Sequence, residues 1–280
     1  MTTYTVSAGQ TSSGITLQNG DYEYVESGGT ANFTTVSAGG FEVVDSGGTA
    51  ISTTISNGGA EYVSSGGTAS DTTVSAYGYE HVLSGGTTIS TTVSYGGYEV
   101  VSNGGTASYT TVSSGGQEYV YSGGTASDTT ISNGGYQYVS SGGTANYTTI
   151  SSGGYEHVLS GGTASDTTLS SGGYEYVSSG GTTVSTTVLS GGTEIVYSGG
   201  DASFTSLTGG GSIELGSVAY VSGATASVNG SDLLTVSVGA QTYTEQLAGP
   251  YTSATFTVSN AGGDTLVTED NAICFCRGTH

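Results

Sequence analysis

Positively charged side chains are almost absent from this sequence, and their absence narrows its possible functions. The 280 residues include 1 Lys or Arg, which is Arg277, against 22 Asp and Glu, and the formal net charge is −21. Contacts with nucleic acid phosphates and anionic lipid surfaces rely on Lys and Arg. We therefore exclude both as partners, which leaves cations, neutral carbohydrate and further copies of the chain.

Other missing features exclude further classes of protein. No run of 18 apolar residues occurs, so we expect no membrane insertion. The opening MTTYTVSAGQTSSG has neither the basic nor the apolar region of a secretory signal peptide, so we expect export by a route that does not use this N-terminus. With 3 His and 2 Cys, neither a Ser/His/Asp triad nor a disulfide framework is indicated, and we predict no enzyme activity.

The residues that are abundant favour β-structure. The chain has 51 Gly and 21 Tyr, together with many Val and Thr. Tyr, Val and Thr favour strands, and Gly takes the positive φ angles that tight corners need. We therefore predict a folded, all-β chain.

A unit of 19 residues, close to SGGTASDTTVSxGGYEYVx, recurs without a change of spacing from Ser27 to the unit that begins at Ser198. A divergent copy fills residues 8 to 26. Strict periodicity near 20 residues is typical of a solenoid, in which each unit buries its apolar face against its neighbours.

The length of the unit indicates the kind of solenoid. A coil of 19 residues has a perimeter of about 60 Å at about 3.3 Å per strand residue. We predict a single-stranded parallel β-helix of about ten 19-residue turns with a C-terminal β cap. A flat antiparallel meander is the rival, and it would leave long exposed edges.

Comparison of the units separates inward from outward positions. One position is Val in ten successive units, from Val25 to Val196, another is always aliphatic, as at Val36, and a third is mostly Ala, as at Ala31. Strands present alternate residues to each face, so these positions predict a thin core. The neighbouring positions vary and are often Tyr, which predicts an outward row of tyrosines.

The tyrosine row has two interpretations. It either stabilises the strands by stacking between coils or forms an aromatic contact surface. The candidate binding residues on the second interpretation are Tyr22, Tyr79, Tyr98, Tyr136, Tyr155 and Tyr174.

A second row is acidic and shares the inward parity of the valines. It runs from Glu23 to Glu194, with Gln137 as its one interruption. Its carboxylates either accept hydrogen bonds from turn N–H groups and the regular Thr positions, or form cation sites or a pH-sensitive seam. The candidate Ca²⁺ ligands are Glu42, Glu61, Glu80, Glu99, Glu118, Glu156 and Glu175.

The acidic row also predicts a dependence of stability on pH. We expect mutual repulsion to raise the glutamate pKa values. Stability should then be greatest below the unfolded value of about 4.3 and fall as the pH climbs.

The pattern SGGTAxxTTVSxGGxExV, present from about residue 8 to 215, resembles the repeats of AIDA-type autotransporter passengers. That resemblance implies a β-helical adhesin that acts in adhesion, cell–cell aggregation and biofilm formation. It also implies an extracellular or cell-surface location. No translocating β-barrel is recognisable in the sequence, so how this chain would be exported is left open.

The C-terminal part departs from the repeat. We expect a solenoid over 1–216, a β-rich cap or small β-sandwich over 217–271, and a third segment over 272–280. The ending CFCRGTH resembles the opening of a bacterial Hint autoprocessing domain. The resemblance implies that Cys274 would be the nucleophile if the full domain were present.

Taken together, these features predict a structural, adhesive β-helix that associates with itself and has no cofactor, unless the acidic row holds Ca²⁺. Two alternatives remain. One is a β-helix that binds surface carbohydrate, and the other is a passive spacer that presents a downstream Hint domain.

Overall fold

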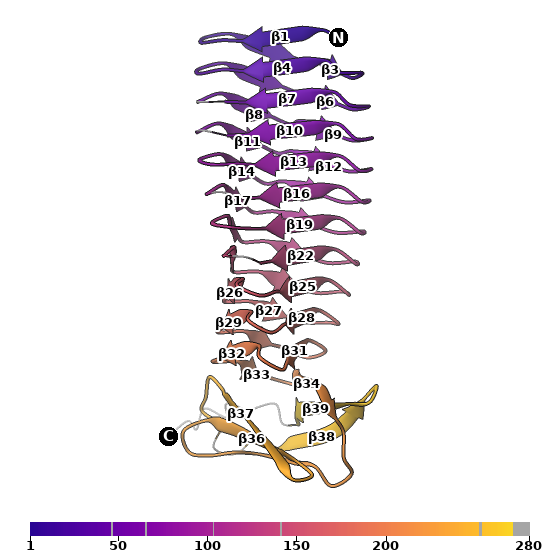
Figure 1. Ribbon diagram of the computed structural model, residues 1–280, viewed down its shortest axis with the longest axis vertical. Coiled ribbons are helices and arrows are strands. Elements are labelled where there is room, and N and C mark those ends of the chain that lie inside the picture. The colour runs from indigo at the N-terminus through magenta and orange to yellow at the C-terminus, as the bar shows by residue number, and fades with distance from the viewer. Residues whose placement is uncertain (46, 65, 103, 141, 252–253, 271–280) are drawn as a thin grey trace, which may run out of the picture.

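The computed structural model describes residues 1–45, 47–64, 66–102, 104–140, 142–251 and 254–270, and within them it contains strands and no helix. Figure 1 shows a rod of stacked coils with the N-terminus at one end and a β cap at the other. Each coil contributes one strand to each of three parallel sheets, which we number I, II and III in the order in which the coil passes through them. Sheets II and III have 11 strands each, so the rod has 11 coils, which confirms the predicted all-β parallel β-helix.

Sheet I contains the longest strands of each coil and continues into the cap. In order of pairing its strands are β1 (Thr3–Val6), β4 (Tyr22–Val25), β7 (Phe41–Val44), β10 (Ala60–Val63), β13 (Tyr79–Val82), β16 (Tyr98–Val101), β19 (Gln117–Val120), β22 (Tyr136–Val139), β25 (Tyr155–Val158), β28 (Tyr174–Val177), β31 (Thr193–Tyr197), β34 (Ser212–Ala219), β39 (Asp264–Glu269) and β38 (Phe256–Ala261).

Sheet II follows a glycine corner. Its strands are β2 (Thr11–Ser13), β5 (Thr30–Asn32), β8 (Thr49–Ile51), β11 (Thr68–Ser70), β14 (Thr87–Ile89), β17 (Thr106–Ser108), β20 (Thr125–Ser127), β23 (Thr144–Asn146), β26 (Thr163–Ser165), β29 (Thr182–Val184) and β32 (Asp201–Ser203).

Sheet III closes the coil. Its strands are β3 (Thr16–Leu17), β6 (Thr35–Val36), β9 (Thr54–Ile55), β12 (Thr73–Val74), β15 (Thr92–Val93), β18 (Thr111–Val112), β21 (Thr130–Ile131), β24 (Thr149–Ile150), β27 (Thr168–Leu169), β30 (Thr187–Val188) and β33 (Ser206–Leu207).

The register between coils equals the repeat, so like residues stack on like. In sheet I, Glu61 pairs with Glu80 and Val63 with Val82, in parallel. This parallel pairing rules out the antiparallel meander. Because strand residues alternate between faces, one register places every Glu and every Val of the row inside the rod.

Glycine pairs turn two of the three corners, and each member of a pair has its own role. Gly28 has a φ of 72°, which favours glycine. A Cβ on Gly29 would overlap the carbonyl oxygen of Val6 on the coil before it. The third corner, between sheets II and III, is turned by Gly14 in the first coil and by a residue other than glycine in the later coils, for example Phe33 with a φ of 56°.

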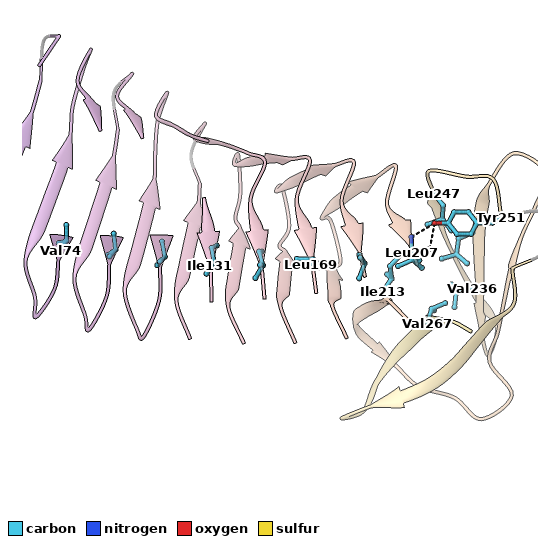
Figure 2. Close-up of a cluster of buried hydrophobic side chains, with 14 of the residues drawn as sticks. Val74, Ile131, Leu169, Leu207, Ile213, Val236, Leu247, Tyr251 and Val267 are labelled. Atoms are coloured by element: carbon cyan, nitrogen blue, oxygen red, sulfur yellow. Dashed lines mark hydrogen bonds between the residues drawn. The ribbon is translucent and has the colours of Figure 1, made fainter. Parts of the chain in front are cut away.

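The core is a column of aliphatic side chains from sheet III that the cap extends. It runs from Leu17 through Val74 and Ile131 to Leu207, and all of these are fully buried. Figure 2 shows the cap side chains Val236, Leu247, Tyr251 and Val267 covering the end of the column.

The cap consists of the β38–β39 hairpin and a small sheet of β35 (Thr225–Val228), β36 (Leu233–Val238) and β37 (Gln241–Gln246). β34 runs through the boundary expected at residue 216: it pairs in parallel with β31 and antiparallel with β39. At the edge of sheet III, the Tyr251 hydroxyl accepts a hydrogen bond from the Leu207 N–H at 2.6 Å and donates one to its carbonyl at 3.1 Å. Segment 272–280, including Cys274, lies outside the described residues.

Candidate functional site

The inner face of sheet I carries the acidic row, and every member of it is fully buried. Each of the nine glutamates is the second residue of a sheet I strand and points inward, and their side chains have 0% exposure. The members are Glu23, Glu42, Glu61, Glu80, Glu99, Glu118, Glu156, Glu175 and Glu194, with Gln137 between Glu118 and Glu156. The row therefore lies inside the rod instead of at its surface.

One carboxylate oxygen of most glutamates accepts a hydrogen bond from a buried threonine 11 residues later in the chain. Thr34 donates to Glu23 at 3.0 Å, Thr53 to Glu42 at 2.9 Å and Thr186 to Glu175 at 2.9 Å. Each donor is the first Thr of a Thr-Thr pair and points inward just before sheet III. This is one of the two interpretations that the sequence allowed.

The second oxygen has a donor only where sheet II supplies a hydroxyl. Thr88 donates to Glu99 at 2.8 Å and Thr183 donates to Glu194 at 3.0 Å, each from 11 residues before. Ser12 donates to Glu23 at 2.5 Å in the same way from the first coil. In the other coils that contribute to the row, that position of sheet II is Ala, which has no hydroxyl. The Oε1 atoms left without a partner belong to Glu42, Glu61, Glu80, Glu118, Glu156 and Glu175.

Burial raises the pKa of the carboxyl groups from Glu42 to Glu194. It brings the pKa of Glu42 to about 8, and that of Glu99, Glu156 and Glu194 to about 7. The pKa values of Glu61, Glu80, Glu118 and Glu175 are also raised well above the ordinary value. The expected direction is correct, but the main cause is desolvation, and repulsion between neighbouring glutamates comes second at Glu42, Glu61, Glu80, Glu118 and Glu175.

The geometry gives the cation interpretation little support. In the described part of the chain, no three His, Cys, Asp or Glu side chains are grouped so that they could hold a metal ion. The row supplies no more than one carboxyl group per coil. Within its own coil, each carboxyl group is surrounded mainly by Thr, Ala or aliphatic side chains. The Ca²⁺ sites at Glu42, Glu61, Glu80, Glu99, Glu118, Glu156 and Glu175 remain a prediction that the fold does not favour.

The outer face of sheet I carries the expected aromatic row. Its rings stack from coil to coil, as in Tyr79–Tyr98 with centroids 4.9 Å apart and Tyr136–Tyr155 at 5.0 Å. All six candidate tyrosines (Tyr22, Tyr79, Tyr98, Tyr136, Tyr155 and Tyr174) belong to such stacks. Because neighbouring rings cover one another's faces, mainly their edges and hydroxyl groups are presented to solvent.

Two histidines join the same stacks. His81 lies 4.8 Å from Tyr62, and His157 lies 4.8 Å from Tyr176, with the ring planes nearly parallel in both pairs. Partial burial lowers the pKa of both imidazoles. The histidines are thus members of the aromatic row, in agreement with the absence of a catalytic triad in the sequence reasoning.

The most exposed aromatic side chains lie elsewhere, at the corners, and the sequence reasoning missed them. Phe33, Tyr109, Tyr147 and Phe204 share the corner between sheets II and III, with exposures of 52 to 65% and φ angles of 56 to 60°. Tyr77 and Tyr95, at the corner between sheets III and I, have exposures of 68% and 73%.

A signal for these residues was available in the repeat. At the corner between sheets II and III other units hold Ser or Asp, as at Ser52 and Asp71, and the positions of Tyr95 and Tyr77 hold Ser114 and Gly96 in neighbouring coils, so a bulky aromatic ring is not required by the fold at any of them. None of the six corner rings stacks on another aromatic ring within the described residues. Their faces are therefore free to contact a partner.

A pocket of about 480 Å³ lies where the last coil meets the cap. Ile213, Leu234 and Val236 form part of its apolar lining, and Tyr197 and Glu245 add polar groups. The Oε1 atom of Glu245 is buried without a partner, and burial followed by repulsion from Glu194 raises the pKa of this carboxyl well above its ordinary value. No sequence pattern indicates this pocket, because its lining comes from segments that are distant in the chain.

Comparison with known proteins agrees with this geometry. The family model described as "Adhesin of bacterial autotransporter system, probable stalk" (AIDA) matches residues 2–59, 94–154 and 135–192, which together are more than half of the chain. A similar solved structure is the crystal structure of the TibC-catalyzed hyper-glycosylated TibA55-350 fragment. It has a TM-score of 0.65 and 40% sequence identity, and the match covers 75% of this chain and 83% of that one. No curated protein sequence matches the chain.

Proposed function

This chain belongs to the AIDA family of bacterial autotransporter adhesins, and we propose that it adheres by side-by-side association with further copies of itself. Adhesion at the cell surface or outside the cell follows from the family. The identity of the partner and the contact surface are our proposal. In it, the exposed aromatic rings at the corners of the coils make the contact, flanked by Ser and Thr side chains.

The observation that carries this proposal is the backbone at the corner between sheets II and III. A bulky residue with a φ near 60° is uncommon, because its Cβ crowds the backbone. Phe33, Tyr109, Tyr147 and Phe204 adopt this conformation, although Ser serves in the same position at Ser52. A strained position that also exposes an aromatic ring is more readily explained by a contact than by folding.

The charge of the rods restricts the type of contact. Two chains with a formal net charge of −21 repel each other, and no Lys or Arg among the first 276 residues can form ion pairs between them. A contact made by aromatic rings and hydroxyl groups avoids this conflict. Because salt screens repulsion between exposed charges, association should strengthen as ionic strength rises.

The test is sedimentation velocity and light scattering of the chain in a concentration series. We expect reversible association of the wild-type chain and a weakening of at least tenfold when Tyr77, Tyr95, Tyr109 and Tyr147 are all replaced by Ser. The melting temperature should stay constant or rise. Ser already occupies the position of Tyr109 and Tyr147 at Ser52 and Ser90 and the position of Tyr95 at Ser114 and Ser152, and at Tyr77 it is a smaller side chain with the same positive φ.

The matched control replaces tyrosines of the stacked row. Tyr98→Thr and Tyr136→Thr introduce the residue that Thr193 provides at the same position. We expect a lower melting temperature from lost stacking, at about 1 kcal/mol per ring pair, with association unchanged. Equal loss of association in both variants would place the contact on sheet I, and a wild-type monomer at all concentrations and salt levels would contradict self-association.

Carbohydrate binding is the second candidate function, and one observation favours it. Along the corner between sheets II and III, free aromatic rings alternate with carboxylates in the order Tyr109, Asp128, Tyr147 and Asp166. Aromatic faces and hydrogen-bond acceptors together suit a neutral sugar. Retention of neutral glycans by a monomeric wild-type chain, abolished by Tyr109→Ser with Tyr147→Ser, would favour this function over self-association.

A further inference from the structure

We propose that the buried glutamate row of sheet I consists largely of neutral carboxylic acids, so that folding of the rod takes up protons and the folded rod is destabilised as the pH rises. The row then acts as a proton-dependent stabiliser of the whole solenoid. The proposal concerns the interior of the rod, and it does not depend on which surface makes the adhesive contact.

The first argument is the absence of any compensation for buried negative charge. Six Oε1 atoms of the row and the Oε2 of Glu80 are buried without a donor. A carboxylate removed from water needs a cationic partner or several donors, and without them it is neutralised by a proton. No Lys or Arg occurs before Arg277, so the solenoid has no side chain that could supply the positive charge.

Gln137 supplies the second argument, because it is a permanent neutral analogue within the row. Its side-chain N–H donates to Glu118 Oε2 at 2.7 Å, and its carbonyl accepts from Thr148 at 3.1 Å. A protonated glutamic acid in this position would make the same two contacts, by donating to the preceding carboxyl group and accepting from the threonine. The position therefore accommodates the neutral form without other changes.

The spacing of the row lets each acid use its neighbour. Glu61 and Glu80 are register partners on adjacent strands, as are Glu156 and Glu175. Neighbouring strands lie about 4.8 Å apart, so side chains of one column are within reach of each other. A protonated carboxyl can thus donate to the orphan oxygen of the adjacent coil, which an ionised pair could not do.

Hydroxyl groups from sheet II occur at separate positions along the row. Thr88 gives Glu99 a second donor, and Thr183 does so for Glu194. Ser12 does the same for Glu23. These three carboxyl groups are the ones for which the structure best satisfies an ionised form. In coils where sheet II has Ala at this position, the carboxyl group lacks a second donor, and a proton must neutralise it instead.

The groups facing the row from every side are neutral or acidic. Sheet II presents Ala, Ser12, Thr88 and Thr183, and the corner presents its inward threonines. Sheet III presents aliphatic side chains. At the cap end, Glu194 faces Glu245, which is also close to Asp201, and both add negative charge. Every titratable neighbour therefore opposes ionisation of the row.

The direction of the pH effect follows from the raised pKa values. An unfolded glutamate releases its proton near pH 4.5, whereas the raised pKa values in the folded rod are about 8 for Glu42 and about 7 for Glu99, Glu156 and Glu194. Stability from the row is complete below pH 4.5 and is lost as the pH rises through the folded values. Each such group raises the unfolding equilibrium constant by about tenfold per pH unit in between.

The experiment is urea unfolding of the full chain from pH 5 to pH 8, together with Glu175→Gln. We expect the wild-type unfolding constant to rise steeply with pH. In Glu175→Gln the new amide can donate to the orphan oxygen of Glu156, as Gln137 does to Glu118. This variant should be more stable than wild type at pH 8, and its pH slope should be lower by about one proton.

Glu99→Gln is the matched control, since it is equally buried but has hydroxyl donors on both oxygens. Its gain at pH 8 should be smaller than that of Glu175→Gln. An unfolding constant that is flat or falls from pH 5 to pH 8, or equal gains in the two variants, would overturn the proposal.

Infrared spectroscopy gives a second readout that does not depend on the variants folding well. We expect the carbonyl band of protonated carboxyl groups in the folded chain at pH 7 and its loss on unfolding. Absence of that band, or recovery of the pH 8 stability with millimolar Ca²⁺, would mean that the row is ionised and would overturn the proposal.

Discussion

At the scale of single residues, one methyl or hydroxyl group decides the state of a buried carboxyl group. Ala50 and Thr88 occupy the same inward position of sheet II, and only Thr88 completes the hydrogen bonding of its glutamate. The Oε1 atom of Glu61, 11 residues after Ala50, has no donor. The repeat thus contains natural variants of the same site, which suggests a direct test.

Ala50→Thr should supply the missing donor to Glu61. A hydrogen bond to a charged group contributes about 2 kcal/mol, so the variant should gain up to that much at pH 8, where more of the Glu61 carboxyl is ionised than at pH 5. At pH 5 the gain should be smaller, because the neutral acid needs the donor less. The measurement is the free energy of unfolding in urea at the two pH values.

Ala50→Val controls for size, since Val has the shape of Thr without its hydroxyl group. If Val and Thr change the stability equally at pH 8, the effect comes from packing and the hydrogen bond is not formed.

At the scale of the element, the glycine pairs decide how closely coils stack. At Gly134 the φ is 76° and a Cβ would contact nothing within 4 Å, whereas at Gly135 a Cβ would overlap the carbonyl of Val112 on the preceding coil. The two glycines of one corner therefore have different functions. Gly134 provides a backbone conformation, and Gly135 leaves room for the adjacent strand.

The pair Gly134→Ala and Gly135→Ala separates these two functions. Gly134→Ala should cost about 1 kcal/mol, because an L-residue takes a positive φ at that price in strain. Gly135→Ala should cost more than twice as much, since the backbone of two coils must move apart. Chemical denaturation of both variants is the measurement, and equal costs would contradict the close approach seen at Gly135.

At the scale of the whole molecule, the stability of a solenoid depends on how well its two ends are covered. Each coil contacts mainly its neighbours, so an uncovered last coil exposes unpaired strand groups and frays. The cap prevents this by pairing β39 with β34 and by placing the Tyr251 hydroxyl against both backbone groups of Leu207. The cap is therefore part of the solenoid's stability.

Tyr251→Phe should leave the buried backbone groups of Leu207 without partners, at a cost of about 1 to 3 kcal/mol. We expect faster amide hydrogen exchange in the last coils, around Leu207, and unchanged exchange near Val44 in the third coil. A uniform increase along the whole rod would contradict local capping.

The sequence by itself determined the architecture, because a solenoid is built from the same contacts between neighbouring coils, repeated along the chain. Strict spacing of 19 residues, the corner glycines and the alternation around Val63 are sufficient to predict coils, register and the inward row, since each coil needs only its neighbours. The stacked tyrosines could be predicted for the same reason. The direction of the glutamate pKa shifts also followed from the repeat.

Only the tertiary structure decided what depends on groups distant in sequence or on the closing of the coil. Which oxygen of each glutamate finds a donor depends on residues 11 positions before and after it, brought together across the interior. Full burial, and with it desolvation as the main cause of the pKa shifts, appears only when three sheets enclose the row. The corner aromatics and the pocket beside Glu245 likewise depend on backbone angles and on the docking of the cap, which no periodic pattern encodes.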